Sequence, residues 1–115
     1  MTYHIISLFP QSLDSYLNES ILKRAIEDKK IKVKFYNPRD FTKGTSYAER
    51  RVDDKPYGGG PGMVIEALPV MKAIAKAKGK KNAKIIWLVP SGKQFDTAYA
   101  KDLAKKHKDI IIVCG

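Results

Sequence analysis

One short stretch of this sequence combines groups that can do chemistry with a backbone that a ligand can approach closely. Residues 52–63 read Val-Asp-Asp-Lys-Pro-Tyr-Gly-Gly-Gly-Pro-Gly-Met. Glycine adopts backbone conformations that other residues avoid, and it has no side chain to hold a ligand off the main chain, whereas proline fixes its own φ angle. The stretch therefore predicts a shaped loop that forms a site, although its composition fits an ordinary surface connection equally well.

The charged residues around this loop leave several roles open. Asp53 or Asp54 could act as a general base, hold a metal-bound phosphate or orient an arginine. A structural role, in which one of them caps or braces the loop, is equally compatible with the sequence. Arg39, Arg50 and Arg51 flank the same stretch, and arginine is the better reader of phosphates and bases. The loop is therefore a candidate contact for a phosphate-bearing partner.

The overall charge also indicates a polyanionic partner. The 115 residues include 22 Lys and Arg against 12 Asp and Glu, which leaves a formal net charge of +10. Such a positive field suits nucleic acid. A lysine-rich solvated surface is the plainer alternative, because most of the excess is lysine on expected helices.

Several classes of protein are excluded by composition. A single cysteine, Cys114, rules out an internal disulfide framework and fits a reducing cytoplasm. His4 and His107 lie far apart in the sequence, so no spacing typical of a metal site is visible. No apolar run approaches the ~18 residues of a membrane span, and the amino-terminal residues lack the features of a signal peptide. We therefore expect a cytoplasmic protein without a membrane segment.

Strands and helices are predicted to alternate around the loop. Strands are expected at residues 2–9, 31–36, 85–89 and 110–113, and helices at 14–30, 69–79 and 96–104. Asn18 is expected to cap the second half of the first helix, and Asp96 the start of the last. The continuous apolar run at 85–89 predicts a parallel central strand, buried on both faces. The order predicts an α/β fold with a layered, mostly parallel sheet and flanking helices.

The carboxyl ends of the expected strands are a second candidate site. Ligands of open α/β sheets bind there, and three strands lead into residues 7–10, 88–92 and 114–115, which include small residues and glycines. Main-chain groups in such turns can hold an adenine-containing ligand without charged side chains, although each turn taken alone reads as an ordinary connection. No dinucleotide fingerprint and no P-loop occurs in the sequence. Cys114 is interpreted as a buried residue rather than a nucleophile.

Five blocks of the sequence occur in the order that is typical of one known family. They are residues 5–10 (Ile-Ile-Ser-Leu-Phe-Pro), 38–41 (Pro-Arg-Asp-Phe), 52–63, 88–92 (Leu-Val-Pro-Ser-Gly) and 113–115 (Val-Cys-Gly). Together they resemble the N-terminal part of bacterial tRNA (guanine-N1)-methyltransferases, of the SPOUT superfamily, over essentially the whole chain. The resemblance implies a SPOUT-like domain with a trefoil knot. Residues 1–115 would form its N-terminal portion, truncated before the knot-forming segment and without a second domain.

The same resemblance implies an activity. Enzymes of the family use S-adenosylmethionine to methylate N1 of the guanosine 3′ to the anticodon in tRNA, and they work as homodimers with the site between subunits. No catalytic residue is implied within this chain, because the catalytic aspartate, its supporting arginine and the tRNA-binding domain would lie beyond Gly115. Residues 1–115 alone are therefore expected to be inactive. The alternatives are a basic RNA-binding module or a folding fragment without catalytic activity.

The residues of the implied site fall into three groups and include no metal ligand. The implied cofactor-binding residues are Trp87, Leu88, Val89, Pro90, Ser91, Gly92, Cys114 and Gly115 in two loops, and Tyr57, Gly58, Gly59, Gly60, Pro61 and Gly62 in the central loop. Asp53, Arg51 and Arg39 are implied on the tRNA side. This chain departs from the commoner family pattern at Trp87, where Tyr is frequent, and at Val89, where Ser is frequent. A main-chain contact would survive both changes, whereas a hydroxyl contact at Val89 would not.

Overall fold

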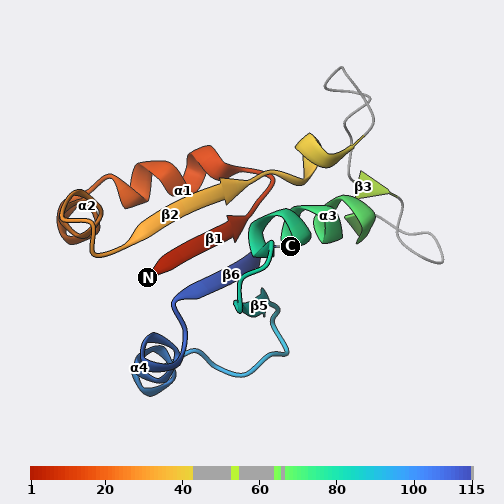
Figure 1. Ribbon diagram of the computed structural model, residues 1–115. Helices are drawn as coiled ribbons and strands as arrows, with labels where there is room; N and C mark the ends of the chain where they lie inside the picture. Colours follow the sequence, from red (N-terminus) through yellow and green to blue (C-terminus); the bar gives the residue numbers. More distant parts are fainter. Residues whose placement is uncertain (43–52, 55–63, 66, 115) are drawn as a thin grey trace.

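Four parallel strands form the central sheet of this computed structural model, which describes residues 1–42, 53–54, 64–65 and 67–114 (Figure 1). β1 (Thr2–Ile6), β2 (Lys32–Tyr36), β5 (Lys84–Leu88) and β6 (Asp109–Cys114) lie in the order β2-β1-β6-β5. Every neighbouring pair is parallel, so all four carboxyl ends lie at one edge. The predicted α/β fold with a parallel sheet is confirmed.

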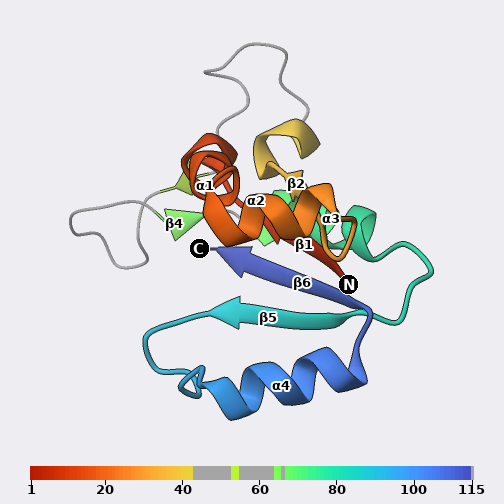
Figure 2. The ribbon, with the colours of Figure 1, turned by 90° about the vertical axis from the view of Figure 1, so that its left-hand side faces the viewer.

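The connections between the strands are mostly helical. They are α1 (Pro10–Leu17), α2 (Ser20–Glu27), the 3-10 helix η1 (Pro38–Phe41), α3 (Ala67–Lys78) and α4 (Thr97–Lys106). A short antiparallel pair, β3 (Asp53–Asp54) with β4 (Val64–Ile65), stands apart from the main sheet. Figure 2 shows α3 and α4 on opposite sides of the sheet.

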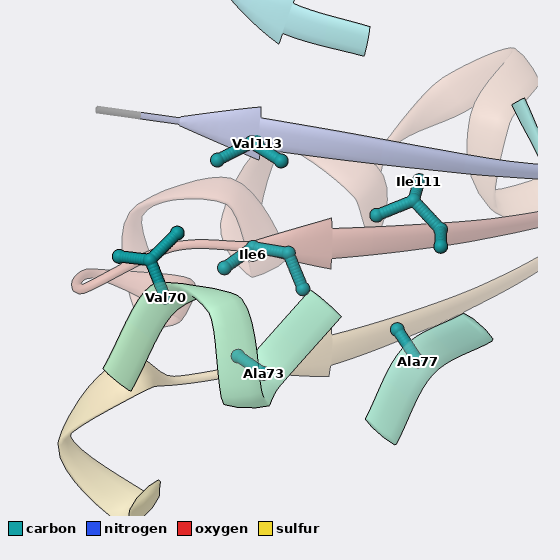
Figure 3. Close-up of a cluster of buried hydrophobic side chains, with 6 residues drawn as sticks. All are labelled: Ile6, Val70, Ala73, Ala77, Ile111 and Val113. Carbon is teal, nitrogen blue, oxygen red and sulfur yellow. The ribbon is translucent and has the colours of Figure 1, made fainter. Parts of the chain in front are cut away.

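The main apolar core lies between α3 and one face of the sheet (Figure 3). Alternate residues of a strand point to the same face, and those of β1 and β6 meet the helix face that repeats every three or four residues. The buried members of this cluster are Ile6, Val70, Ala73, Ala77, Ile111 and Val113. Lys72 and Lys76 are exposed, so α3 is amphipathic, with its apolar face toward the sheet.

The opposite face of the sheet is covered in part by α4. Ala100, Leu103 and Ala104 of this helix line a small cavity of about 80 Å³ together with residues of β1, β5 and β6. The carboxylate of Asp96 caps the helix, because its Oδ1 accepts a hydrogen bond from the backbone N–H of Tyr99 at 2.7 Å. The cap predicted from the sequence is therefore confirmed.

A buried polar bridge ties β1 to both of its neighbours. The His4 side chain is 0% exposed, and its Nε2 lies 2.9 Å from Oδ1 of Asp109 on β6. Because the carboxylate only accepts, Nε2 carries the proton, and in the neutral ring Nδ1 accepts from the hydroxyl of Tyr36 on β2 at 3.2 Å. Burial, and secondarily the charge of Asp109, raise the pKa of Tyr36, which keeps this donor protonated. His4 is therefore a structural residue that joins three strands.

The helix expected over residues 14–30 is wrong as a single element. The structure has two helices, and Asn18 ends the first instead of capping the second: its N–H donates to the Asp14 carbonyl at 3.1 Å. Glu19 is the N-cap of α2, with φ −124° and ψ 146°. These extended angles cannot continue a helix, so the turn between Leu17 and Ser20 breaks it.

The predicted central position of the strand at 85–89 is also wrong. β5 is parallel, as expected, but it lies at the edge of the sheet, with β6 as its neighbour among the described residues. Trp87 and Leu88 are 57% and 55% exposed. An apolar run predicts that a strand is buried, but it does not identify the elements that bury it. The first strand is also shorter than expected and ends at Ile6 instead of residue 9.

Replacing Gly79 with alanine should destabilise the fold by about 1 kcal/mol. Gly79 follows α3 with φ +53°, and its N–H donates to the Ala75 carbonyl at 2.9 Å. A Cβ at this position would have room, its nearest neighbour being Lys81 Nζ at 4.0 Å, so the cost is conformational. Chemical denaturation measures the change in unfolding free energy. Ala75→Gly, on the exposed side of α3, is the comparison variant, and its lower helix propensity should cost a similar amount of stability. A stabilised Gly79→Ala variant would contradict the conformational argument.

Candidate functional site

The carboxyl ends of three neighbouring strands lie side by side and form the candidate site. In the sheet register Val113 of β6 is paired with Ile6 of β1 and with Trp87 of β5, and Leu88 is paired with Cys114. Figure 2 shows the arrowheads of β5 and β6 pointing to the same edge. The structure therefore brings together segments that are 26 (Trp87 and Val113) and 107 (Ile6 and Val113) positions apart in the sequence, at the edge where α/β sheets bind ligands.

The turn after β5 is exposed at this edge. The N–H of Gly92 donates to the Val89 carbonyl at 3.2 Å, and residues 88–92 are exposed. A Cβ on Gly92 would lie 3.2 Å from Cγ2 and 3.4 Å from the carbonyl oxygen of Val89, so the close approach favours glycine. Beside this turn, the exposed apolar side chain of Trp87 offers a flat surface. Main-chain groups next to an apolar surface suit a planar, weakly charged ligand such as an adenine ring.

The turn after β1 is satisfied internally. The N–H of Ser7 donates to the Tyr36 carbonyl at 3.0 Å, and the Ser7 hydroxyl accepts from the N–H of Phe9 at 3.1 Å. The Ser7 residue is only 7% exposed. This turn therefore supports the fold at the site's edge, in line with its reading as an ordinary strand-to-helix connection.

Cys114 lies at the last described position of β6, beside Leu88. Its side chain is partly buried, and burial raises the pKa of its thiol. A thiol that resists ionisation is a poor nucleophile. The chemistry of Cys114 therefore favours packing over covalent catalysis, as the sequence indicated.

Arg39 is held at the same edge by the 3-10 helix that follows β2. Oδ1 of Asn37 accepts from the backbone N–H of Arg39 at 3.0 Å, and the Thr42 hydroxyl donates to the Arg39 carbonyl, also at 3.0 Å. Nδ2 of Asn37 donates to the Leu8 carbonyl at 3.5 Å, which links this helix to the turn after β1. Figure 1 shows η1 next to the start of α3. The backbone of Arg39 is therefore fixed near the candidate site.

The glycine-rich loop is bracketed by the short β3–β4 pair. Asp53 is paired with Ile65 and Asp54 with Val64, in antiparallel register. This pair was missed by the sequence patterns, because two-residue strands leave no periodicity to detect. The other predicted site residues lie outside the described part of the chain: Arg51, Tyr57, Gly58, Gly59, Gly60, Pro61, Gly62 and Gly115.

Two further features concern only the residues that the structure describes. Among them no group of His, Cys, Asp and Glu side chains is arranged to hold a metal ion. Within the same part of the chain, no helix has the length and apolar character needed to cross a membrane.

Comparisons with family models, curated proteins and solved structures all match this chain to the same kind of protein. The model of the family described as "tRNA (Guanine-1)-methyltransferase TrmD" matches residues 1–115. A tRNA (guanine-N(1)-)-methyltransferase of Caldanaerobacter subterraneus is 43% identical over the whole chain, which covers 46% of that relative. One from Campylobacter jejuni subsp. doylei is 44% identical, with 48% of it covered. The crystal structure of tRNA (m1G37) methyltransferase from Aquifex aeolicus superposes with a TM-score of 0.85 at 28% identity, over all of this chain and 50% of that one. The chain thus spans about half the length of the relatives it matches.

Proposed function

Because the chain belongs to the tRNA (guanine-1)-methyltransferase family, we propose that the full-length protein methylates N1 of the guanosine 3′ to the anticodon of tRNA, with S-adenosylmethionine as methyl donor. Residues 1–115 are the N-terminal portion of its SPOUT methyltransferase domain. The observation that carries the proposal is the register pairing of Leu88 with Cys114. It sets two of the blocks that resemble the family side by side, at the edge where α/β sheets generally bind ligands.

The residues present fit the cofactor at this edge. When bound, S-adenosylmethionine supplies an activated methyl group on sulfur. The main chain of residues 88–92 holds the adenine ring, with Trp87 as an apolar wall, and residues 114–115 complete this side. Val89 has no hydroxyl, so its contact is made by the main chain. Gly92 keeps the turn open, because a side chain there would press against Val89.

The glycine-rich loop supplies the other wall of the proposed site. Residues 57–62 border the methionine end of the cofactor and the target guanosine, while Asp53, Arg51 and Arg39 contact the tRNA. Removal of the N1 proton needs a base, and methyl transfer then depends on alignment. We place that base in the part of the full-length protein that this chain does not span. The trefoil knot lies in the same part, and the full-length protein works as a cytoplasmic homodimer. Asp53 and Asp54 are positioning groups in this scheme.

The activity is tested with the full-length protein and labelled S-adenosylmethionine. Transcripts of one tRNA that carry G or A on the 3′ side of the anticodon are the matched substrates, and primer extension locates the methyl group. We expect label in the G transcript alone, with an extension stop at that base, and no turnover by residues 1–115. Label in both transcripts would contradict the position. Turnover by the 115-residue chain would contradict the placement of the base.

A binding module without chemistry is the second candidate, because the net charge of +10 by itself favours RNA binding. It predicts salt-sensitive tRNA binding by the full-length protein and no label in either transcript. The same assay therefore separates the two functions.

A further inference from the structure

Lysines that are scattered along the sequence gather at the edge of the sheet opposite the candidate site. Parallel strands begin at a common edge, so the segments that lead into them become neighbours. Here those segments are rich in lysine. We define the amino-edge lysines as Lys30, Lys32, Lys80, Lys81, Lys84 and Lys108.

Backbone contacts fix the neighbourhood of these lysines across all four strands. The N–H of Lys32 donates to the Met1 carbonyl at 3.0 Å, and the N–H of Thr2 donates to the Lys108 carbonyl at 2.8 Å. On the other side, Lys84 is paired in the register with Ile110, two residues after Lys108. Figure 2 shows the end of α3, the start of β5 and the chain's N-terminus on the same side of the molecule. Strands about 4.8 Å apart spread this edge over about 15 Å.

The charge of this edge is exposed and only weakly balanced. All six amino-edge lysines are exposed, and none makes an ion pair with another described residue. No acidic residue occurs from residue 67 to 95, which includes Lys80, Lys81 and Lys84. Within two sequence positions of these lysines the acidic residues are Asp28 and Asp109, and Asp109 is bonded to His4.

We propose that the amino-edge lysines contact the phosphate backbone of the RNA substrate away from the target base. This inference rests on the proposed function for the identity of the RNA. Lysines act as mobile point charges that suit phosphates without reading sequence. Strands of five residues separate the amino edge from the candidate site by about 16 Å. A single nucleotide cannot bridge that distance, whereas an RNA stem can, so the two edges together fit one folded RNA.

The test compares two triple variants of the full-length protein with equal net charge. The amino-edge variant combines Lys80→Gln, Lys81→Gln and Lys108→Gln. The control combines Lys34→Gln, Lys72→Gln and Lys101→Gln, three exposed lysines in the middle of β2, α3 and α4. Binding of a tRNA transcript is measured over a range of KCl concentrations, together with kcat and KM for tRNA. Thermal melting establishes that both variants are folded.

We expect the amino-edge variant to bind about tenfold or more weakly near physiological salt, with a slope of log affinity against log salt reduced by about 2. Its KM for tRNA should rise by the same factor while kcat at saturating tRNA stays unchanged. Equal behaviour of the two triple variants would overturn the inference. The inference would also be overturned if the amino-edge variant bound tRNA normally and lost only its binding to phosphatidylglycerol vesicles, because that result would assign the edge to an anionic membrane.

The outcomes also separate this inference from the proposed function. Wild-type protein that binds tRNA without methylating it, and loses that binding in the amino-edge variant alone, would refute the activity and support the RNA contact. Normal methylation by wild type, combined with variants that cannot be distinguished from each other, would refute the RNA contact alone.

Discussion

Replacing His4 with alanine should lower the free energy of unfolding by about 3 to 5 kcal/mol. The imidazole is 0% exposed and bonds on both ring nitrogens, to Asp109 and Tyr36. Its removal leaves a cavity between three strands and takes a partner from a carboxylate that is 22% exposed. Since proteins are stable by only about 5 to 15 kcal/mol, the variant should unfold at much lower denaturant concentration. Urea denaturation followed by circular dichroism measures the change.

Two further variants separate the cavity from the lost hydrogen bonds. Tyr36→Phe removes one hydrogen bond and leaves the volume of the side chain almost unchanged. It should lower the free energy of unfolding by about 1 kcal/mol. In the double variant with His4→Ala, this cost should largely disappear, because the two residues share one interaction. His107→Ala is the control for loss of a histidine, and as a half-buried residue at the end of α4 it should cost less than about 1 kcal/mol. Additive costs for His4 and Tyr36 would show that the bridge is not a coupled unit.

Replacing Gly92 with valine should weaken binding of S-adenosylmethionine to the full-length protein by about tenfold or more, equivalent to about 1.4 kcal/mol. The first added carbon would lie 3.2 Å from Val89 Cγ2, and valine adds two methyl groups beyond it. The main chain could then no longer approach the ligand closely. Isothermal titration calorimetry measures the dissociation constant, and we expect Gly92→Ala to lie between valine and wild type.

The control for this turn is Gln94→Val, at a position two residues on that is also exposed. It places a valine outside the proposed contact, so the affinity for S-adenosylmethionine should stay within about twofold of wild type. Both valine variants should melt near the wild-type temperature, because the segment contributes little to the core. Unchanged affinity in Gly92→Val would remove the turn from the cofactor site.

Much of the local structure was predictable from the sequence, because local patterns have local physical causes. The alternation of lysine with apolar residues at 31–36 predicts β2, and the repeat of Val70, Ile74 and Ala77 predicts the buried face of α3. Asp96 and Gly79 marked a helix start and a helix end because few residue types satisfy those backbone groups. The blocks at 88–92 and 113–115 likewise identified two segments of the candidate site before any contact between them was known.

Other features were decided only by the tertiary structure. The break at Glu19 was hidden within an apparently continuous apolar repeat, because the repeat constrains which face is buried and not where one helix ends. The apolar run that ends at Leu88 predicted a strand, yet its place at the sheet edge depends on the order in which distant strands pair. His4 gave no sign in the sequence of its partners on β2 and β6.

By itself, then, the sequence determined most of the elements and the blocks of a site, since each depends on residues within a few positions of one another, and the alternation of strands and helices indicated a parallel sheet. Only the tertiary structure paired Leu88 with Cys114 and gathered the amino-edge lysines at the opposite edge. The physical reason is the parallel sheet. It aligns strand ends from distant parts of the chain, so ligand-binding turns collect at one edge and the charged turns that enter the strands collect at the other.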